Sequence, residues 1–359
     1  MAMSTVTLES VRLAPSPAVR GTPERLVSLD AFRGLTMLLL ISHGFGLYDA
    51  FKWPQAEHAA WVGCTLWDLI QPAFTFMVGV AMPLALSKRA AQVRHVLWRA
   101  LVLLLLSNVL SNWGSTQGLK LQFINVLCQI AFSYVLCYFI LQLRFMSQVI
   151  AAAAIMVAHH ALFYLFPGPA GPFDPNANIG AVIDLHLLGY NYSGYYTTLN
   201  FLGNALTVLF GCWTGLLMLS NRPHGERIRI LSACGVAALA VGALLANWIP
   251  MVKRLWLGSF TFFSAGWVLL AFAAFYWLVE VKGQKRWTFP LVVVGMNCIF
   301  IYSFSQVLRG WLSRGIATFD GQQFAILGPA GAIPHNLLVM TAMWGLCYWL
   351  YRRGIFFKI

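Results

Sequence analysis

The sequence is poor in charge, and this deficit excludes several classes of protein. Only 10% of the 359 residues are Asp, Glu, Lys or Arg, whereas soluble globular domains carry about 25% charged residues. An ordinary water-soluble domain is therefore excluded. The strict alternation of polar and apolar residues that marks the strands of a membrane barrel is also missing. The apolar residues, 59% of the chain, form continuous runs instead, which predicts an all-α, polytopic integral membrane protein.

Motifs for metals and phosphates are missing as well. The seven cysteines form no CxxC pair and lie mostly within apolar runs, where cysteine usually serves packing. Since there is no HExxH, no zinc-ligand spacing and no glycine-rich phosphate loop, we expect no metal. Residues 1–25 lack the apolar core of a signal peptide and are predicted to be a disordered cytoplasmic leader. Residues 26–359 then form a single transmembrane domain.

Ten apolar runs of suitable length predict about ten transmembrane helices. They cover residues 31–50, 66–87, 96–112, 122–142, 146–166, 199–219, 229–249, 258–280, 288–308 and 333–351. If the chain starts in the cytoplasm, 18 of the 24 Lys and Arg residues fall on the cytoplasmic side and six on the other. This bias predicts that both termini are cytoplasmic. It assigns the net charge of +13 to short inner loops rather than to nucleic-acid binding.

Two segments on the predicted outer side are longer than turns. Residues 167–198 are rich in Gly, Pro, Asn and Tyr, and residues 309–333 follow the ninth span. Loops of this length are usually functional or disordered, and the aromatic content argues against disorder. We therefore expect two ordered outer loops, whose roles the sequence does not reveal.

Ionisable groups inside membrane segments are costly, so each one is a functional candidate. Asp30 and Arg33 lie at the inner end of the first span, three residues apart and hence on one helix face. One interpretation is an interfacial ion pair that anchors the helix. The other is a guanidinium that meets an anionic ligand, such as a phosphate, at the cytoplasmic mouth.

A second group of polar residues lies at the outer side. His58 follows Glu57 in a short connection, and Asp68 begins the second span. An imidazole titrates near neutrality, which suits a proton acceptor or an acyl carrier, although a lone loop histidine is more often only solvated. Asp68 is either a helix cap or a group that orients the imidazole or binds an amine. Ser42, in the outer half of the first span, lies on the way to the same surface.

Three further residues have two interpretations each. Lys253 stands at an outer helix junction, against the inside bias of the basic residues, and either snorkels or faces a ligand or an inward-facing carboxylate. Asn297 and Gln129 are amides within spans. Such amides more commonly form hydrogen bonds between helices, and contact with a substrate is the alternative.

Four blocks of the sequence resemble one family, in order. They are SLDAFRGLT at 28–36, HAAWVGCTLWDLIQPAFTFMVGVAM at 58–82, VKRLWLGSF at 252–260 and GMNCIFIY at 295–302. In these blocks, and over about residues 24–351, the chain is similar to the transmembrane acyltransferase family typified by heparan-alpha-glucosaminide N-acetyltransferase. It most resembles the bacterial inner-membrane member associated with N-acetylglucosamine and chitin utilisation.

This resemblance implies an enzyme of the bacterial inner membrane that moves acetyl from cytoplasmic acetyl-CoA to the amine of glucosamine or a glucosaminide on the periplasmic side. It implies that His58 is catalytic, as a general base or an acetyl carrier, with Asp68 beside it. Arg33 and Asp30 would meet the nucleotide end of CoA. The candidates for contact with the acceptor or the thioester are Ser42, Glu57, Lys253, Asn297 and Gln129.

The chain also departs from the family pattern, so other functions stay open. Ser42 and His43 stand where relatives commonly carry Asn, and Gln129 stands where relatives carry Arg, which puts the acceptor preference in doubt. One alternative is a transporter of amino sugars or other solutes, although the sequence has no two matching halves. Another is an O-acyltransferase acting on a cell-envelope glycan. A homodimer would fit the usual symmetry of oligomers, but no segment identifies an interface.

Overall fold

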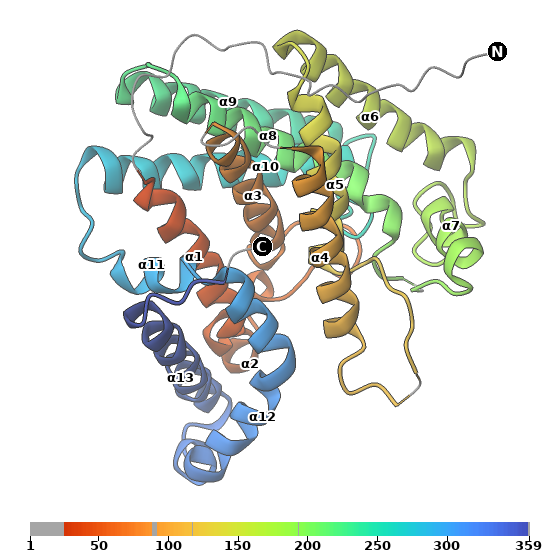
Figure 1. Cartoon of the computed structure of the whole chain (residues 1–359). Coiled ribbons are helices and arrows are strands. Elements are labelled where there is room, and N and C mark those ends of the chain that lie inside the picture. The colour runs from red at the N-terminus through yellow and green to blue at the C-terminus, as the bar shows by residue number, and fades with distance from the viewer. Residues whose placement is uncertain (1–24, 88–91, 117, 193, 358–359) are drawn as a thin grey trace, which may run out of the picture.

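The computed structural model describes residues 25–87, 92–116, 118–192 and 194–357, and over these residues the chain is helical, with no β-strand (Figure 1). The predicted leader lies outside the described residues, apart from Arg25. The α-helices are α1 (Val27–Ile41), α2 (Leu47–Phe51), α3 (Ile70–Leu86), α4 (Val93–Ser111), α5 (Val126–Leu141), α6 (Phe145–Leu165), α7 (Ile179–Leu188), α8 (Phe201–Leu219), α9 (His224–Leu245), α10 (Gly258–Tyr276), α11 (Phe289–Gly295), α12 (Cys298–Ala325) and α13 (Ala332–Arg352). The short turns of helix are η1 (Gly44–Gly46), η2 (Pro54–Ala56), η3 (Trp67–Leu69), η4 (Thr198–Asn200), η5 (Trp277–Val281) and η6 (Gly328–Gly331).

The helices confirm a polytopic membrane protein but not the predicted number of spans. Among the described residues, six helices are long and apolar enough to cross a membrane, and two bent pairs raise this number to eight. The remaining predicted spans, 122–142 and 333–351, correspond to α5 and α13. Helix α5 has only 16 residues, fewer than the ~20 that a hydrocarbon core requires, and α13 is not among the six. Which side of the membrane each end faces stays the prediction of the charge bias.

Two predicted spans are broken, and the breaks lie near the candidate residues. Helices α1 and α2 meet at 54°, with His43 and Phe45 in left-handed conformations between them. Helices α11 and α12 meet at 78°, with Asn297 at the break. A left-handed residue cannot continue a right-handed helix, which accounts for the first break. At the second break, Asn297 has a φ of −122° and a ψ of 36°, which is not a helical conformation.

Helix α1 packs very closely against α11 because both carry glycine at the crossing. A Cβ on Gly34 would lie 1.8 Å from the carbonyl oxygen of Leu291, and one on Gly295 would lie 1.9 Å from that of Asp30. Only glycine allows backbones to approach this far. The crossing brings the start of α12 beside the inner half of α1, where Asp30 and Arg33 lie.

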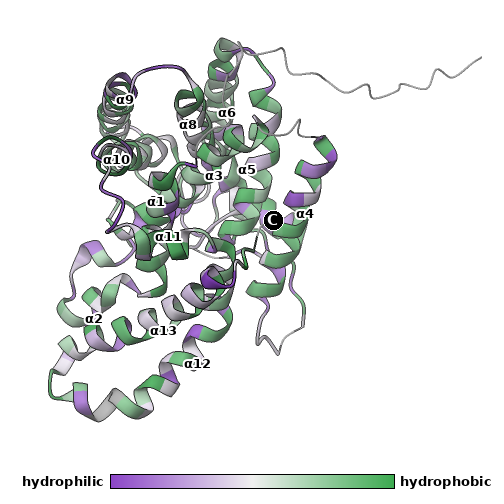
Figure 2. Cartoon of the chain, turned by 60° about the vertical axis from the view of Figure 1, so that its left-hand side comes forward, coloured by the Kyte–Doolittle hydropathy of each residue, from purple (hydrophilic) through white to green (hydrophobic). Residues whose placement is uncertain are grey.

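The ends of the fold differ in character. Both views show α8, α9 and α10 together at one end and α2, α12 and α13 at the other, where the ribbons of α12 and α13 carry more hydrophilic colour (Figure 2). The expectation of an outer loop at 309–333 is wrong, because α12 continues to Ala325 and α13 begins at Ala332. The polar residues of this segment lie within the continuous helix α12. After the short turn η6 the chain continues into α13, so α12 and α13 form a helical hairpin. Within the described part of residues 167–198, the chain forms the helix α7.

Candidate active site

His58 and Asp68 form a hydrogen-bonded pair at the start of the third helix. The imidazole Nδ1 lies 2.7 Å from the Asp68 Oδ1. Since a carboxylate oxygen only accepts, this separation requires a proton on Nδ1, which leaves Nε2 as the unprotonated nitrogen of the neutral ring. The His58 side chain is 42% exposed, while that of Asp68 is only 2% exposed. The buried Asp68 carboxylate therefore holds the His58 ring in place, and the exposed part of the ring carries the basic nitrogen Nε2.

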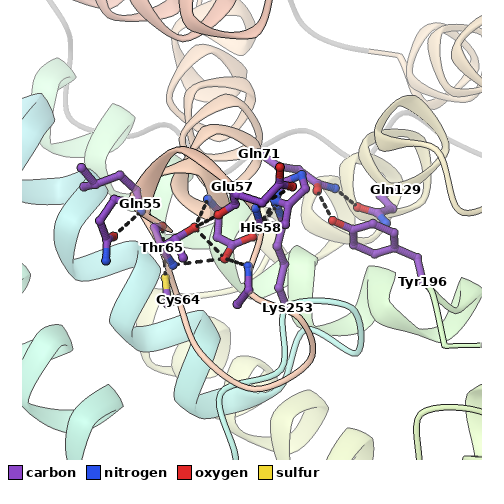
Figure 3. A network of polar contacts seen from close by, with 12 residues as sticks. Gln55, Glu57, His58, Cys64, Thr65, Gln71, Gln129, Tyr196 and Lys253 are labelled. Carbon is purple, nitrogen blue, oxygen red and sulfur yellow. Dashed lines mark hydrogen bonds and ion pairs between the residues drawn. The ribbon is translucent and has the colours of Figure 1, made fainter. Parts of the chain in front are cut away.

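Asp68 is surrounded by donors. Lys253 Nζ lies 3.2 Å from Oδ1, the same oxygen that His58 contacts. The backbone N–H groups of Ala59 and Thr65 donate to Oδ2 at 3.1 Å each, and the Thr65 hydroxyl lies 3.0 Å from it. Figure 3 shows these contacts converging beside His58. A buried carboxylate needs such partners to offset its lost hydration.

Lys253 faces inward, so the second of its two interpretations is correct. Its side chain is only 7% exposed, and burial lowers the pKa of Lys253, an effect that the Asp68 carboxylate opposes. The turn that carries it is fixed by Trp256, which is fully buried, adopts a left-handed φ of 54° and donates from its indole to the Thr207 hydroxyl. A bulky residue takes this conformation only where packing holds it there.

The loop that carries His58 is tied to two other segments. Gly63 donates its backbone N–H to Met251, and the Trp61 indole donates to the carbonyl of Phe173. The Arg254 guanidinium lies over the rings of Trp61 and Tyr195. These contacts thus link residues 58–66 to Phe173 and Tyr195 and to residues 250–257.

His58 lines a cavity of about 310 Å³, here called the central cavity. Its lining includes Met37, Leu40, His58, Trp67, Gln71, Asn125, Tyr195, Tyr196, Lys253, Tyr302 and Gln306. Two polar side chains of the lining are held by hydrogen bonds, and the second bond leads to a residue behind the wall. Tyr196 donates to Gln71 at 3.2 Å, and Gln71 donates to the buried Gln129 at 2.6 Å (Figure 3). These bonds hold the polar part of the wall in one orientation.

Several of these residues escaped the sequence analysis. Gln71 follows Asp68 by three positions, so helical spacing could have placed it on the same face. Tyr195 and Tyr196 lie in the aromatic segment that was expected to be ordered, but no motif marks them. Tyr302 lies in the GMNCIFIY block, although only its neighbour Asn297 was selected there.

Four residues that were predicted to contact the acceptor or the thioester do not line the central cavity, and three of them lie close to it. Ser42 is buried at the end of α1, where its hydroxyl donates to Leu39 and accepts from the backbone of Phe45. The Glu57 carboxylate accepts from the backbone N–H of His58. Gln129 is fully buried behind Gln71. These three residues support the neighbours of the site rather than line its cavity.

The fourth residue, Asn297, directly precedes the first residue of α12. Its amide donates to the carbonyl of Ile355 at 3.2 Å, and its side-chain oxygen accepts from the backbone N–H of Phe357 at 3.0 Å. It therefore ties the C-terminal segment to the break between α11 and α12. The structure does not bring it to His58.

Asp30 and Arg33 line a second cavity, of about 450 Å³, here called the Arg33 cavity. Asp30 accepts from Arg25 at 2.7 Å and lies 3.8 Å from Arg33, so the predicted pairing on one helix face is confirmed. Arg99 of α4 also lines the cavity, and its buried Nε has no partner among the described residues. Three guanidinium groups against one carboxylate leave the cavity with an excess of positive charge.

The two cavities lie in series along α1 and α12. On α1 the lining residues Arg33, Met37 and Leu40 are four and three positions apart, and on α12 Ile299, Tyr302 and Gln306 are three and four positions apart. Residues at such spacing share one helix face, and seven residues of helix rise ~10 Å. The facing sides of the two helices therefore connect the region of Arg33 to that of His58.

The chain is similar to known proteins of one family. Residues 25–246 match the family model for the catalytic region of heparan-alpha-glucosaminide N-acetyltransferase. The human protein of that name is 27% identical, and the alignment covers 94% of this chain and 60% of the human one. The mouse protein is 25% identical over 95% of this chain and 61% of its own. The chain spans about three fifths of the length of these relatives, and the alignments cover most of this chain. Since the family model also matches more than half of it, the chain belongs to the heparan-alpha-glucosaminide N-acetyltransferase family.

Proposed function

We propose that the chain transfers an acetyl group from acetyl-CoA to the amine of glucosamine or a glucosaminide, with His58 as the group that handles the proton or the acetyl. The observation that carries this proposal is the His58–Asp68 pair, which turns a basic nitrogen toward a polar cavity. Family membership supports the acyltransfer class, and the relatives' printed name supports an amino-sugar acceptor.

The residues divide the chemistry as follows. An ammonium cannot attack a carbonyl, so a base must first take a proton from the acceptor nitrogen. His58 Nε2 takes this proton, and Asp68 holds the Nδ1 proton and stabilises the imidazolium that results. As the acceptor nitrogen bonds to the thioester carbonyl carbon, the carbon–sulfur bond breaks, and the CoA thiolate takes the proton from the imidazolium. Lys253 balances the Asp68 charge when the imidazole is neutral. The same Nε2 would be the attacking atom if His58 carried the acetyl covalently, so both routes need the same orientation of the ring.

The cavities fit acetyl-CoA as the donor, which supplies an acetyl group already activated as a thioester. The nucleotide end of CoA is anionic, and the Arg33 cavity offers three guanidinium groups, one with a buried nitrogen lacking a partner among the described residues. Guanidinium groups are the usual partners of phosphates. The shared faces of α1 and α12 run from this cavity toward His58, as a long, narrow donor requires.

The charge bias of the sequence gives the proposal a direction. With basic loops inside, the Arg33 cavity faces the cytoplasm and the His58 loop faces the periplasm of a bacterial inner membrane. The acceptor would then be acetylated on the side opposite to the donor's nucleotide. This direction is testable by adding acetyl-CoA to only one side of sealed vesicles.

The direct test uses purified protein in detergent with acetyl-CoA and glucosamine, comparing wild type with His58→Ala. Loss of the base is expected to lower the rate by about 10²–10⁴-fold. His186→Ala is the matched control, because His186 is an exposed histidine of α7 that lines neither cavity. Retained activity in folded His58→Ala would overturn the assignment of His58, and no product with wild type would overturn the acceptor.

A transporter remains the second candidate, because cavities in series also suit a solute pathway. Uptake of radiolabelled glucosamine into proteoliposomes without acetyl-CoA would favour it. Accumulation of N-acetylglucosamine only when acetyl-CoA is present would favour the enzyme.

A further inference from the structure

Two adjacent histidines of α6, His159 and His160, lie near the predicted outer end of this helix, and the proposed function uses neither. Both are buried, with exposed fractions of 1% and 8%. An ionisable side chain inside a membrane segment is costly and needs a partner. Nε2 of His159 is buried and has no hydrogen-bond partner among the described residues, whereas both ring nitrogens of His160 have one. Hydrogen bonds therefore hold His160 in a defined orientation.

The two hydrogen bonds of His160 fix its protonation and tie α6 to the start of α10. The backbone N–H of Gly258 donates to Nε2 at 3.0 Å, so this nitrogen carries no proton. Nδ1 lies 2.7 Å from the carbonyl oxygen of Met156 and must donate to it, because a carbonyl only accepts. Gly258 is the first residue of α10, and the apolar side chain of Leu257 before it cannot cap the helix. His160 supplies the acceptor that Leu257 lacks.

The imidazole and the start of α10 are in direct contact. A Cβ on Gly258 would lie 3.0 Å from Cε1 of His160 and 3.1 Å from the sulfur of Met156. Only glycine therefore fits at this position without displacing the ring, and a change at His160 reaches the first turn of α10.

The first turn of α10 holds the segment that carries Lys253. The Ser259 hydroxyl donates to the carbonyl of Pro250 at 2.9 Å, and the backbone N–H of Trp256 donates to the carbonyl of Lys253 at 2.9 Å. Residues 250–257 lie outside any helix, so their position depends on such contacts. A shift of the α10 N-terminus therefore moves Lys253.

A shift of Lys253 would in turn change the surroundings of His58. Its Nζ lies 3.3 Å from Nδ1 of His58 and 3.2 Å from Oδ1 of Asp68. The ammonium opposes a second positive charge on the ring, and it weakens the attraction of the Asp68 carboxylate for that charge. Arg254, on the same segment as Lys253, lies near His58 and acts in the same direction. Glu57 belongs to the His58 loop itself and accepts from the backbone N–H of His58.

We propose that His160 is a positioning residue for the reaction: by capping α10, it keeps Lys253 in contact with Asp68 and His58. This inference rests on the proposed function, in which His58 takes the proton or the acetyl. Catalytic groups must be held within about 0.5 Å of their productive positions. The hydrogen bond from Gly258 to His160 meets this need for a segment that has no helical structure of its own.

The test measures the titration of His58 without relying on activity. Diethyl pyrocarbonate modifies the unprotonated imidazole, and mass spectrometry of the digested protein reports the modification of each histidine separately. In His160→Leu, the midpoint of His58 modification is expected to move to higher pH by about 0.5 unit, a fraction of the effect of a neighbouring charge in full contact. The direction follows because positive charge moves away from the ring. His186, an exposed histidine of α7, is the internal reference and should not shift.

Two variants isolate the hydrogen bond. His160→Gln keeps an acceptor for the Gly258 N–H and should keep the wild-type midpoint. His159→Leu replaces the neighbouring buried histidine, whose Nε2 has no partner among the described residues, and should keep it as well.

Activity with glucosamine links the midpoint to the reaction. His160→Leu should lower kcat about tenfold with the KM for acetyl-CoA unchanged, because small misplacements of catalytic groups cost up to about 10²-fold. His160→Gln and His159→Leu should stay within about twofold of wild type.

The outcomes separate the two proposals. An unchanged His58 midpoint in folded His160→Leu would overturn the inference, and so would an equal shift in His160→Gln or His159→Leu. If wild type acetylates no acceptor, the proposed function fails, while the midpoints still decide whether His160 positions Lys253. If His160→Leu does not fold, His160→Asn takes its place, because Asn keeps a donor near the Nδ1 position and lacks the acceptor at Nε2.

Discussion

The surroundings of His58 and the Arg33 cavity hold their charges in opposite ways. Near His58, the side chains of Asp68 and Lys253 are 2% and 7% exposed and lie 3.2 Å apart. In the Arg33 cavity, the side chains of Arg25 and Arg33 are 52% and 26% exposed and share the single carboxylate of Asp30. The charges near His58 are paired with each other, whereas the Arg33 cavity has more positive than negative charge.

This difference teaches what each region is built to do. Internally paired charges cannot bind a ligand ion without losing a partner, but they fix the orientation of the groups they surround. Unbalanced, solvent-accessible guanidinium groups fix little and attract anions. The first region therefore suits proton transfer at a defined atom, and the second suits recognition of a soluble, phosphorylated donor.

The largest effect is expected from Asp68→Asn, which removes the charge and keeps the size. An Asn amide can donate to Nδ1, which shifts the imidazole proton to Nε2 and removes the base. The rate should fall by about 10²–10⁴-fold with little change in KM for acetyl-CoA. Glu226→Gln, which removes a carboxylate outside the central cavity and the Arg33 cavity, is the control. A KM effect without a kcat effect would contradict the role of Asp68.

Lys253→Met is expected to cost about 3–5 kcal/mol of stability, because it leaves the Asp68 charge buried with one partner fewer. Thermal unfolding in detergent measures this loss. The double variant Lys253→Met with Asp68→Asn removes both charges and should recover much of the stability, since coupled residues are not additive. It should recover none of the activity. A single variant as stable as wild type would show that the pair contributes nothing.

The exposed region predicts a smaller effect, confined to donor binding. Arg33→Gln and Arg99→Gln should each raise the KM for acetyl-CoA by about ten- to a hundredfold, the contribution of one charge-assisted hydrogen bond. Arg94→Gln removes an exposed arginine of α4 outside the cavity and should change little. Acetyl-dephospho-CoA sharpens the test: an arginine that binds the 3′-phosphate should lose its effect with this donor. A fall in kcat with no change in KM would show that these arginines do not bind the donor.

The sequence was most informative about the two site residues that one short block contains. His58 and Asp68 are ten residues apart, so one motif contains both, whereas an inward-facing Lys253, from another block, was only one of two alternatives. Tyr195 and Tyr196 of the cavity wall could not be predicted, because no motif marks them and they meet Gln71 and Tyr302 only through packing. Asn297 illustrates the opposite error: its block is similar to the family, but its amide binds the C-terminal backbone.

The fold shows the same limit of local information. Continuous apolar runs predicted helices well, since the membrane demands internal hydrogen bonds. They did not predict that α1 and α11 would end early, because the breaks depend on left-handed residues such as His43 and on side-chain contacts such as those of Asn297. Residues 309–333 were expected to form a loop because they lie between two apolar runs, yet a less apolar segment still forms a helix where a neighbouring helix, α13, packs against it.

Substitution or alkylation of Cys64 shows whether any change near His58 lowers the activity, and almost no effect on the activity is expected. The thiol lies in the same loop, but burial, reinforced by the Asp68 charge, raises the pKa of Cys64 to about 12. At neutral pH it is therefore a thiol rather than the nucleophilic thiolate. In a Cys234→Ser background, which removes the exposed cysteine of α9, activity should survive N-ethylmaleimide within about twofold, and Cys64→Ser should behave alike. Rapid inactivation that Cys64→Ser prevents would instead make the thiol accessible beside the base, and acyl transfer through sulfur would then compete with His58 as the route.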